Sequence, residues 1–201
     1  MTKQTGINYN FYYWGPLLFK TKLSSIDLEV CANLCSKKSK FVNETLAGVI
    51  KHEHSINAGE YYKIIEPYLD SLRQCFKQWY GKPLNKKITM QVAWVNFMVA
   101  GEFNPPHIHT ACDFSSILIV KSTEKLKEEY KKYKKRFTKV GGGPGSISFT
   151  YGEVQSHSIT NKELFPEEGD LFIFPATLVH FVYPFMCKDE RITISANFIL
   201  Q

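Results

Sequence analysis

The sequence predicts an α+β fold in which a helical flank leans on a β-sandwich or barrel. Up to about Lys87, apolar residues recur mostly at helical spacing. After Lys87, short β-branched or aromatic runs alternate with Gly, Pro, Asp and Asn, which is the rhythm of a closed antiparallel sheet. A chain of 201 residues has room for one domain with a substantial core. We therefore expect a single domain over 1–201, mainly helical at 1–87 and β-rich at 88–201.

Two helices account for most of the expected flank. The segment 24–41 opens with serines that can cap a helix, and apolar residues follow at helical spacing. The segment 59–81 carries a longer apolar stripe. Within it, Pro67 is expected to kink the helix near its start and Gly81 to end it.

The β core is expected to contain six strands separated by turn residues. The glycine-rich stretch 141–145 has no following Lys-Ser/Thr and helix, so we interpret it as a turn into a strand rather than a phosphate loop. The expected strands lie at 87–100, 115–121, 145–152, 170–175, 180–185 and 191–200.

One segment accounts for the whole net charge of +6. Between Lys121 and Lys139, nine Lys or Arg stand against three Glu, a difference of +6. We expect a short exposed helix at 122–140, inserted between two strands. Such a helix could meet nucleic acid or an acidic partner. Solvated charge is the more usual meaning of such a run, and it is the interpretation that we favour.

The cellular setting is expected to be the cytoplasm. Five cysteines at irregular spacing suit reduced thiols. Prolines and a histidine interrupt the longest apolar runs, so no membrane span is expected. The first ten residues lack the basic and then apolar pattern of a secretory signal.

Three histidines form the candidate metal site. In "PHIHT" (106–110) the prolines favour an extended chain, and alternation then places His107 and His109 on one face. His180 follows in "FPATLVHFVYPF", where another strand is expected. Imidazoles on facing strands make an open-sided site that suits iron, copper, zinc or nickel.

The last strand adds a polar face to this site. Its alternate residues on the other face are apolar, so the polar row is expected to point into the barrel. A buried arginine needs an anion, and Arg191 can bind a carboxylate with two parallel hydrogen bonds while Thr193 adds a hydroxyl. 2-Oxoglutarate has the required shape, because it chelates a metal at one end and carries a carboxylate at the other. The polar row consists of Arg191, Thr193, Ser195 and Asn197.

The order of these motifs resembles that of a known enzyme family. The chain has H-x-H, then a distal histidine, then R-x-[ST] about ten residues further on. This order resembles that of the iron(II)- and 2-oxoglutarate-dependent oxygenases. Their fold is a prolyl-hydroxylase-like double-stranded β-helix, also described as jelly-roll or cupin-like. More narrowly, the chain from "WVNFMVAGEFNPPHIHT" to "RITISANF" is similar to 2OG-Fe(II) oxygenases of marine bacteria and tailed phages. "LAGVIKHEHSI" near the N-terminus shares the likeness, which covers most of the chain except the basic insert.

The resemblance implies a reaction, its cofactors and its site residues. Fe(II), 2-oxoglutarate and dioxygen would hydroxylate an unidentified substrate, with formation of succinate and CO2, in the host cytoplasm if a phage encodes the chain. His107, His109 and His180 would be the catalytic metal ligands, and Arg191 with Thr193 would hold the co-substrate. Further residues expected at the co-substrate or lining its pocket are Asn96, Asn197, Met98, Ser115 and Tyr183.

His109 departs from the pattern of the wider superfamily, in which this slot holds Asp or Glu. Three ligand sets follow. All three histidines bind the metal, which we favour; or only two bind, with water or another ligand in the gap; or Asp113, at the same strand parity, swings in. An all-histidine site is one unit more positive, which alters iron retention and redox poise.

Two other function classes share the expected fold. A cupin-like metal protein with different chemistry would not need Arg191. A catalytically inactive binding module would use the basic helix as its working surface. We also expect a homodimer, and we interpret the cluster His52, Glu53 and His54 as a surface feature near a helix.

Overall fold

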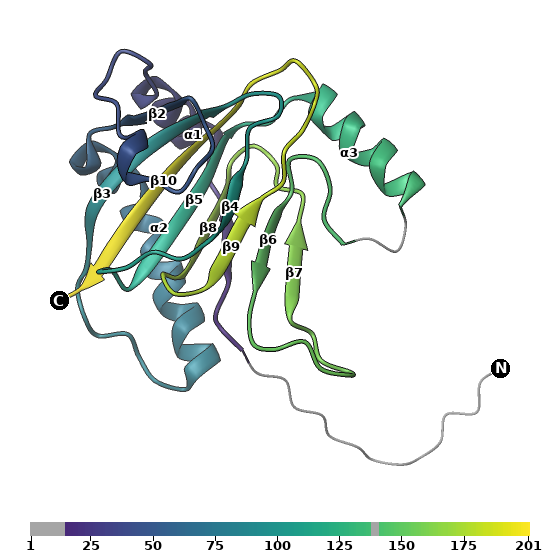
Figure 1. The fold of residues 1–201 in the computed structure, drawn as a ribbon. Helices are drawn as coiled ribbons and strands as arrows, with labels where there is room; N and C mark the ends of the chain where they lie inside the picture. The colour runs from purple at the N-terminus through teal and green to yellow at the C-terminus, as the bar shows by residue number, and fades with distance from the viewer. Residues whose placement is uncertain (1–14, 138–140) are drawn as a thin grey trace.

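Two antiparallel sheets face each other in the computed structural model, which describes residues 15–137 and 141–201 (Figure 1). The larger sheet has the order β1-β8-β5-β10-β3-β2, and the smaller has β4-β9-β6-β7. The strands are β1 (Phe19–Lys22), β2 (His52–Ser55), β3 (Ile88–Met98), β4 (Asn104–His107), β5 (Phe114–Lys121), β6 (Ile147–Thr150), β7 (Asn161–Leu164), β8 (Asp170–Pro175), β9 (Val179–Val182) and β10 (Arg191–Leu200).

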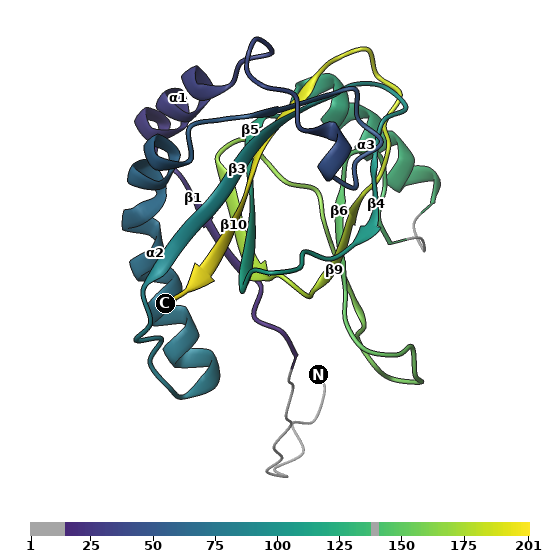
Figure 2. The ribbon, with the colours of Figure 1, turned by 60° about the vertical axis from the view of Figure 1, so that its left-hand side comes forward.

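Helices α1 (Ser25–Leu34) and α2 (Ala58–Tyr80) cover the outer face of the larger sheet (Figure 2). The side chain of Ser24 caps α1 and that of Asn57 caps α2, each by accepting backbone N–H groups. The helix predicted at 24–41 ends earlier, at Leu34. The helix predicted at 59–81 is confirmed, and it runs through Pro67 as one element that ends at Gly81.

The core has two parts, one on each face of the larger sheet. Between that sheet and the helices lie residues such as Tyr61, Leu72 and Ile194. Between the two sheets lie residues such as Phe172, Phe149 and Met98. The alternation of β10 explains the division, because its apolar residues face the helices and its polar row faces the barrel interior.

The segment 1–87 contributes more than a helical flank. β1 pairs with β8 and β2 pairs with β3, so both edges of the larger sheet come from this part of the chain. The interpretation of residues 52–54 as a surface cluster was wrong: Glu53 and His54 lie in β2 and are each only 1% exposed. Polar side chains on a short edge strand concealed its β character.

The basic insert is a helix, as predicted: α3 (Glu124–Arg136) lies beside the smaller sheet (Figure 1). Leu126 is the buried residue of this helix, and the ring of Tyr130 stacks on Phe165 with centroids 4.4 Å apart. Its predicted end at 138–140 lies outside the described residues. In the described ranges, no helix has both the length and the apolar character needed to cross a membrane.

Candidate metal centre

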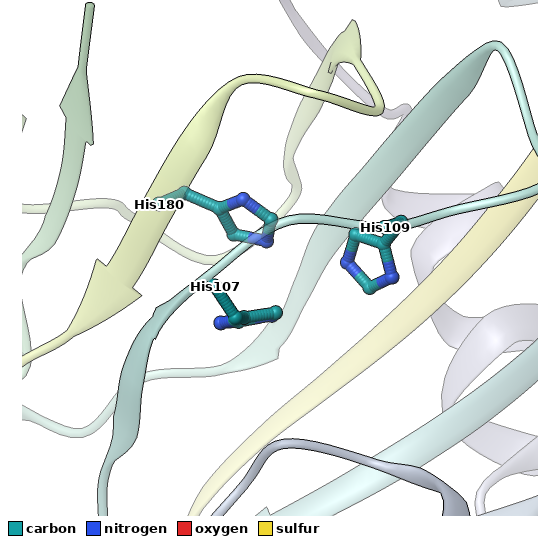
Figure 3. A group of neighbouring side chains, drawn as sticks. All are labelled: His107, His109 and His180. Atoms are coloured by element: carbon teal, nitrogen blue, oxygen red, sulfur yellow. The ribbon is translucent and has the colours of Figure 1, made fainter.

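Three imidazoles, those of His107, His109 and His180, lie close together (Figure 3). His107 ends β4, His109 follows two residues later, and His180 lies in β9 opposite His107. One ligand atom from each lies within 4.8 Å of the others. Ring centroids are 4.2 Å apart for His107 and His180, and 5.2 Å apart for His109 and either partner. This spacing suits three nitrogens around one cation.

Backbone carbonyls fix the tautomer of two of these rings. Nδ1 of His107 lies 2.7 Å from the carbonyl of Pro105, and Nδ1 of His180 lies 2.9 Å from that of Leu178. Since a carbonyl only accepts hydrogen bonds, Nδ1 carries the proton in both rings. Nε2 is therefore left with its lone pair, the form in which histidine binds a metal.

Two of the three imidazoles are neutral at physiological pH. Burial above all, and then the neighbouring His107, lower the pKa of His180 to about 3. Burial and His107 also lower the pKa of His109 to about 4. Neither ring has to lose a proton before it binds a metal at neutral pH.

Arg191 is a buried cation for which the described residues supply no counter-ion. It is 3% exposed, and its Nε and Nη2 have no hydrogen-bond partner among the described residues. Burial lowers its pKa to about 10, so it is still charged at neutral pH. It shares the inner face of β10 with Thr193, whose Oγ1 accepts a hydrogen bond of 3.2 Å from Asn96 Nδ2. Unpaired donors in this position fit the carboxylate of a ligand.

Two hollows meet at the histidines. An inner cavity is lined by residues of both sheets and of the loop before β2. An outer groove of about 330 Å³ runs past Trp94 and Asn197 to residues 42–47. Polar and aromatic residues of the inner cavity are His107, His109, His180, Glu53, Trp94, Asn96, Asn104, Ser116 and Ser195.

Several predicted pocket residues lie elsewhere. Asn197 lines the outer groove, where its Oδ1 accepts a 2.8 Å hydrogen bond from Ser115. Met98 is buried in the core between the sheets, and Tyr183 donates to Glu163 at 3.4 Å. Neither is among the residues that line the two hollows.

Asp113 is not part of the histidine group. Its side chain is exposed, and Oδ2 accepts a 2.7 Å hydrogen bond from the backbone N–H of Leu200. This contact holds the carboxylate at the end of β10. The described geometry therefore brings together three histidines and no aspartate.

Sequence reasoning missed Glu53 as a cavity residue. β2 pairs with β3 so that Glu53 lies opposite Asn96, and both side chains line the inner cavity. The alternation of "HEHS" was the available signal, but it was interpreted as part of a helix-proximal surface.

The facing sheets define the class of protein: a double-stranded β-helix, as predicted. The fold is similar to the crystal structure of a prolyl-4-hydroxylase from Pseudomonas putida, with a TM-score of 0.58, 15% identity and 92% of each chain covered. It is also similar to a viral collagen prolyl hydroxylase from Paramecium Bursaria Chlorella virus-1, with a TM-score of 0.54 and 14% identity over 90% of this chain and 94% of that one. A prolyl hydroxylase from Trichoplax adhaerens is similar with a TM-score of 0.56 and 14% identity, over 92% of this chain and 83% of that one.

The family follows from the sequence. Residues 92–197 match the family described as "Putative 2OG-Fe(II) oxygenase", and the chain belongs to that family. Among curated proteins, none matches this sequence. The chain is thus a 2-oxoglutarate-dependent oxygenase, an oxidoreductase that uses Fe(II) as its metal and 2-oxoglutarate as its co-substrate.

Proposed function

We propose that His107, His109 and His180 together hold Fe(II), and that Arg191 with Thr193 anchors the far carboxylate of 2-oxoglutarate for hydroxylation of a second substrate. The observation that carries the proposal is the pairing of an unpartnered buried guanidinium with three converging imidazoles inside one barrel. Bound iron supplies the redox chemistry that couples decarboxylation of 2-oxoglutarate to succinate with oxidation of a substrate C–H bond.

Each chain residue has a role that its surroundings support. The Pro105 and Leu178 carbonyls orient His107 and His180, so that both rings present Nε2. Asn96 donates to Thr193 and also to Ser195, at 3.2 Å in each case, which holds these hydroxyls on the inner face of β10. The site is thereby organised before any ligand enters.

The second substrate is proposed to approach along the outer groove. Trp94, Ile108 and the segment 42–47 form its walls, and it leads directly to His107 and His109. Its apolar rim includes Ile108 at 45% exposure and Val92 at 43%. The groove is thus open to a molecule with an apolar part.

Succinate formation tests the proposal. Purified protein with Fe(II), 2-oxoglutarate and dioxygen should form succinate without an added substrate, and His180→Ala should abolish it. Replacement of an exposed histidine, His157→Ala, is the matched control and should leave turnover unchanged. Succinate formation by His180→Ala at the wild-type rate would contradict the role of the triad.

Two alternatives make different predictions. A cupin-like protein with other chemistry would bind metal with no dependence on Arg191. An inactive binding module would bind neither metal nor co-substrate. The cytoplasmic setting, a phage origin, a homodimer and an interaction of α3 with nucleic acid stay predictions.

A further inference from the structure

Glu53 is a buried carboxyl group that the roles above do not use. It lies in β2, is 1% exposed, and its Oε2 has no hydrogen-bond partner among the described residues. Buried carboxyl groups without a partner are rare, because leaving water costs several kcal/mol of solvation when the group is charged. This group therefore calls for a ligand or an ion.

The backbone holds Glu53 in the inner cavity. A Cβ built on Gly48 would lie only 2.7 Å from Glu53 Oε1, so the loop before β2 passes directly over the carboxyl group. Glu53 and all three histidines line this same cavity. The side chain cannot turn to solvent without moving that loop.

The nearby acidic residue Glu102 has a different role. Its two oxygens accept backbone N–H groups of Lys51 and Val99, both at 3.0 Å, so it is a satisfied structural carboxylate. It offers Glu53 no positive charge. Burial, and then Glu102, raise the pKa of Glu53 to about 7. A cation in the cavity would favour the charged form of Glu53.

We propose that Glu53 supplies the negative charge that the all-histidine site lacks, as a carboxylate that faces the bound metal ion from β2. The inference rests on the proposed function of the triad. Imidazole ligands carry no negative charge, so both charges of a divalent ion stay uncompensated. Glu53 is the buried acid that lines the same cavity, and its Oε2 has no hydrogen-bond partner among the described residues. It does not belong to the group whose ligand atoms lie within 4.8 Å, so it acts across the cavity rather than as a member of the triad.

Co(II) affinity of the metal-free full-length chain tests this proposal without any turnover. Isothermal titration should show that Glu53→Gln binds Co(II) about 10–100-fold more weakly than the wild type, the range typical of lost outer-shell partners. Glu53→Asp keeps the charge and should recover most of the affinity. Asp113→Asn removes a carboxylate that lies outside the cavity and should bind Co(II) as the wild type does.

His180→Ala separates the two proposals. If His180→Ala loses Co(II) binding while Glu53→Gln keeps wild-type affinity, the role of Glu53 is overturned and the triad stands. If Glu53→Gln and Glu53→Asp weaken binding equally, charge is not the cause and the proposal also fails. Gln has the shape of Glu, and Oε2 of Glu53 has no hydrogen-bond partner among the described residues, so the variant is expected to fold. A thermal melt of each variant, with and without Co(II), checks this directly.

Discussion

At the scale of single residues, the site is defined by charges that the protein itself does not neutralise. Arg191 is a guanidinium whose Nε and Nη2 bond to nothing in the described chain. Leaving such donors unpaired is unfavourable, since each lost hydrogen bond to water is not replaced. Under the proposed function, this unfavourable burial prepares a binding site for a carboxylate that arrives with its own negative charge.

Replacing Arg191 tests that reasoning. Arg191→Ala should raise the concentration of 2-oxoglutarate needed for half-maximal succinate formation roughly 10–100-fold, since charge-assisted hydrogen bonds contribute about 1.5–3 kcal/mol. Arg191→Lys keeps the charge but loses the planar guanidinium, so its 2-oxoglutarate requirement should lie between those of the wild type and Arg191→Ala. Arg136→Ala, an exposed arginine of α3, is the control. An unchanged requirement in Arg191→Ala would argue for the cupin-like alternative.

The buried histidines predict a pH dependence of stability. His109 and His180 have pKa values of about 4 and about 3 in the fold, both below the ordinary 6.5. The unfolded chain therefore binds more protons, so the unfolding free energy of the metal-free protein should fall as pH drops from about 6.5 towards 4. The steepest slope is about 1.4 kcal/mol per pH unit for each histidine.

Urea unfolding between pH 4 and pH 8, with metal removed, measures this slope. His180→Gln should reduce it, because glutamine does not titrate. Glu53 has the opposite effect on the unfolding free energy. Because its pKa is raised to about 7 in the fold, it stabilises the folded state at low pH, and this stabilisation is lost as pH rises through about 7. A wild-type profile that is flat between pH 4 and 6.5 would contradict the neutral, buried state of the histidines.

At the scale of elements, the insert α3 is tied to the barrel by a tight turn. Gly145 has φ 70°, and a Cβ there would lie 2.9 Å from Cδ1 of Leu126, the buried residue of the helix. The turn 141–145 thus leads into β6, and Leu126 of α3 packs against its Gly145. Close packing here depends on the absence of a side chain.

Gly145→Ala should lower the unfolding free energy by more than the roughly 1–3 kcal/mol that the left-handed backbone alone costs. Gly81→Ala is the matched comparison, because Gly81 has φ 67° and no atom within 4 Å of its Cβ position. Urea denaturation of both variants measures the difference. If Gly145→Ala destabilises no more than Gly81→Ala, the contact with Leu126 contributes nothing.

The elements also show what the sequence could predict. Six strands after Lys87 were predicted from their β-branched and aromatic runs, and helix α2 was predicted from its apolar stripe. β1, β2 and β7 were missed because they are four-residue strands rich in polar side chains. Their strand character comes from pairing with distant neighbours, which local pattern does not encode.

The same distinction applies to the site. Alternation within one strand placed Arg191 and Thr193 on the inner face, and a motif of two residues brought His107 and His109 together. Glu53 reaches the cavity only because β2 pairs with β3. A long-range contact of this kind follows from the fold and not from spacing.

At the scale of the whole molecule, the barrel interior is divided between packing and chemistry. One part is filled by the apolar core between the sheets, and the other is the inner cavity lined by the three histidines and Glu53. Arg191 is buried on the inner face of β10 but is not among the residues that line this cavity. Helices α1 and α2 cover the larger sheet from outside, while the three histidines come from the smaller sheet and its loop (Figures 1 and 2). The proposed function therefore needs both sheets, because the histidines and Arg191 lie on different ones.

Anaerobic titration with Fe(II) and 2-oxoglutarate tests this arrangement most directly. The account predicts that the weak visible charge-transfer band of an iron-bound keto acid develops in the wild type, is absent in His180→Ala, and requires far more 2-oxoglutarate in Arg191→Ala. A band of wild-type intensity in His180→Ala, or none in the wild type with both ligands at saturation, would contradict it.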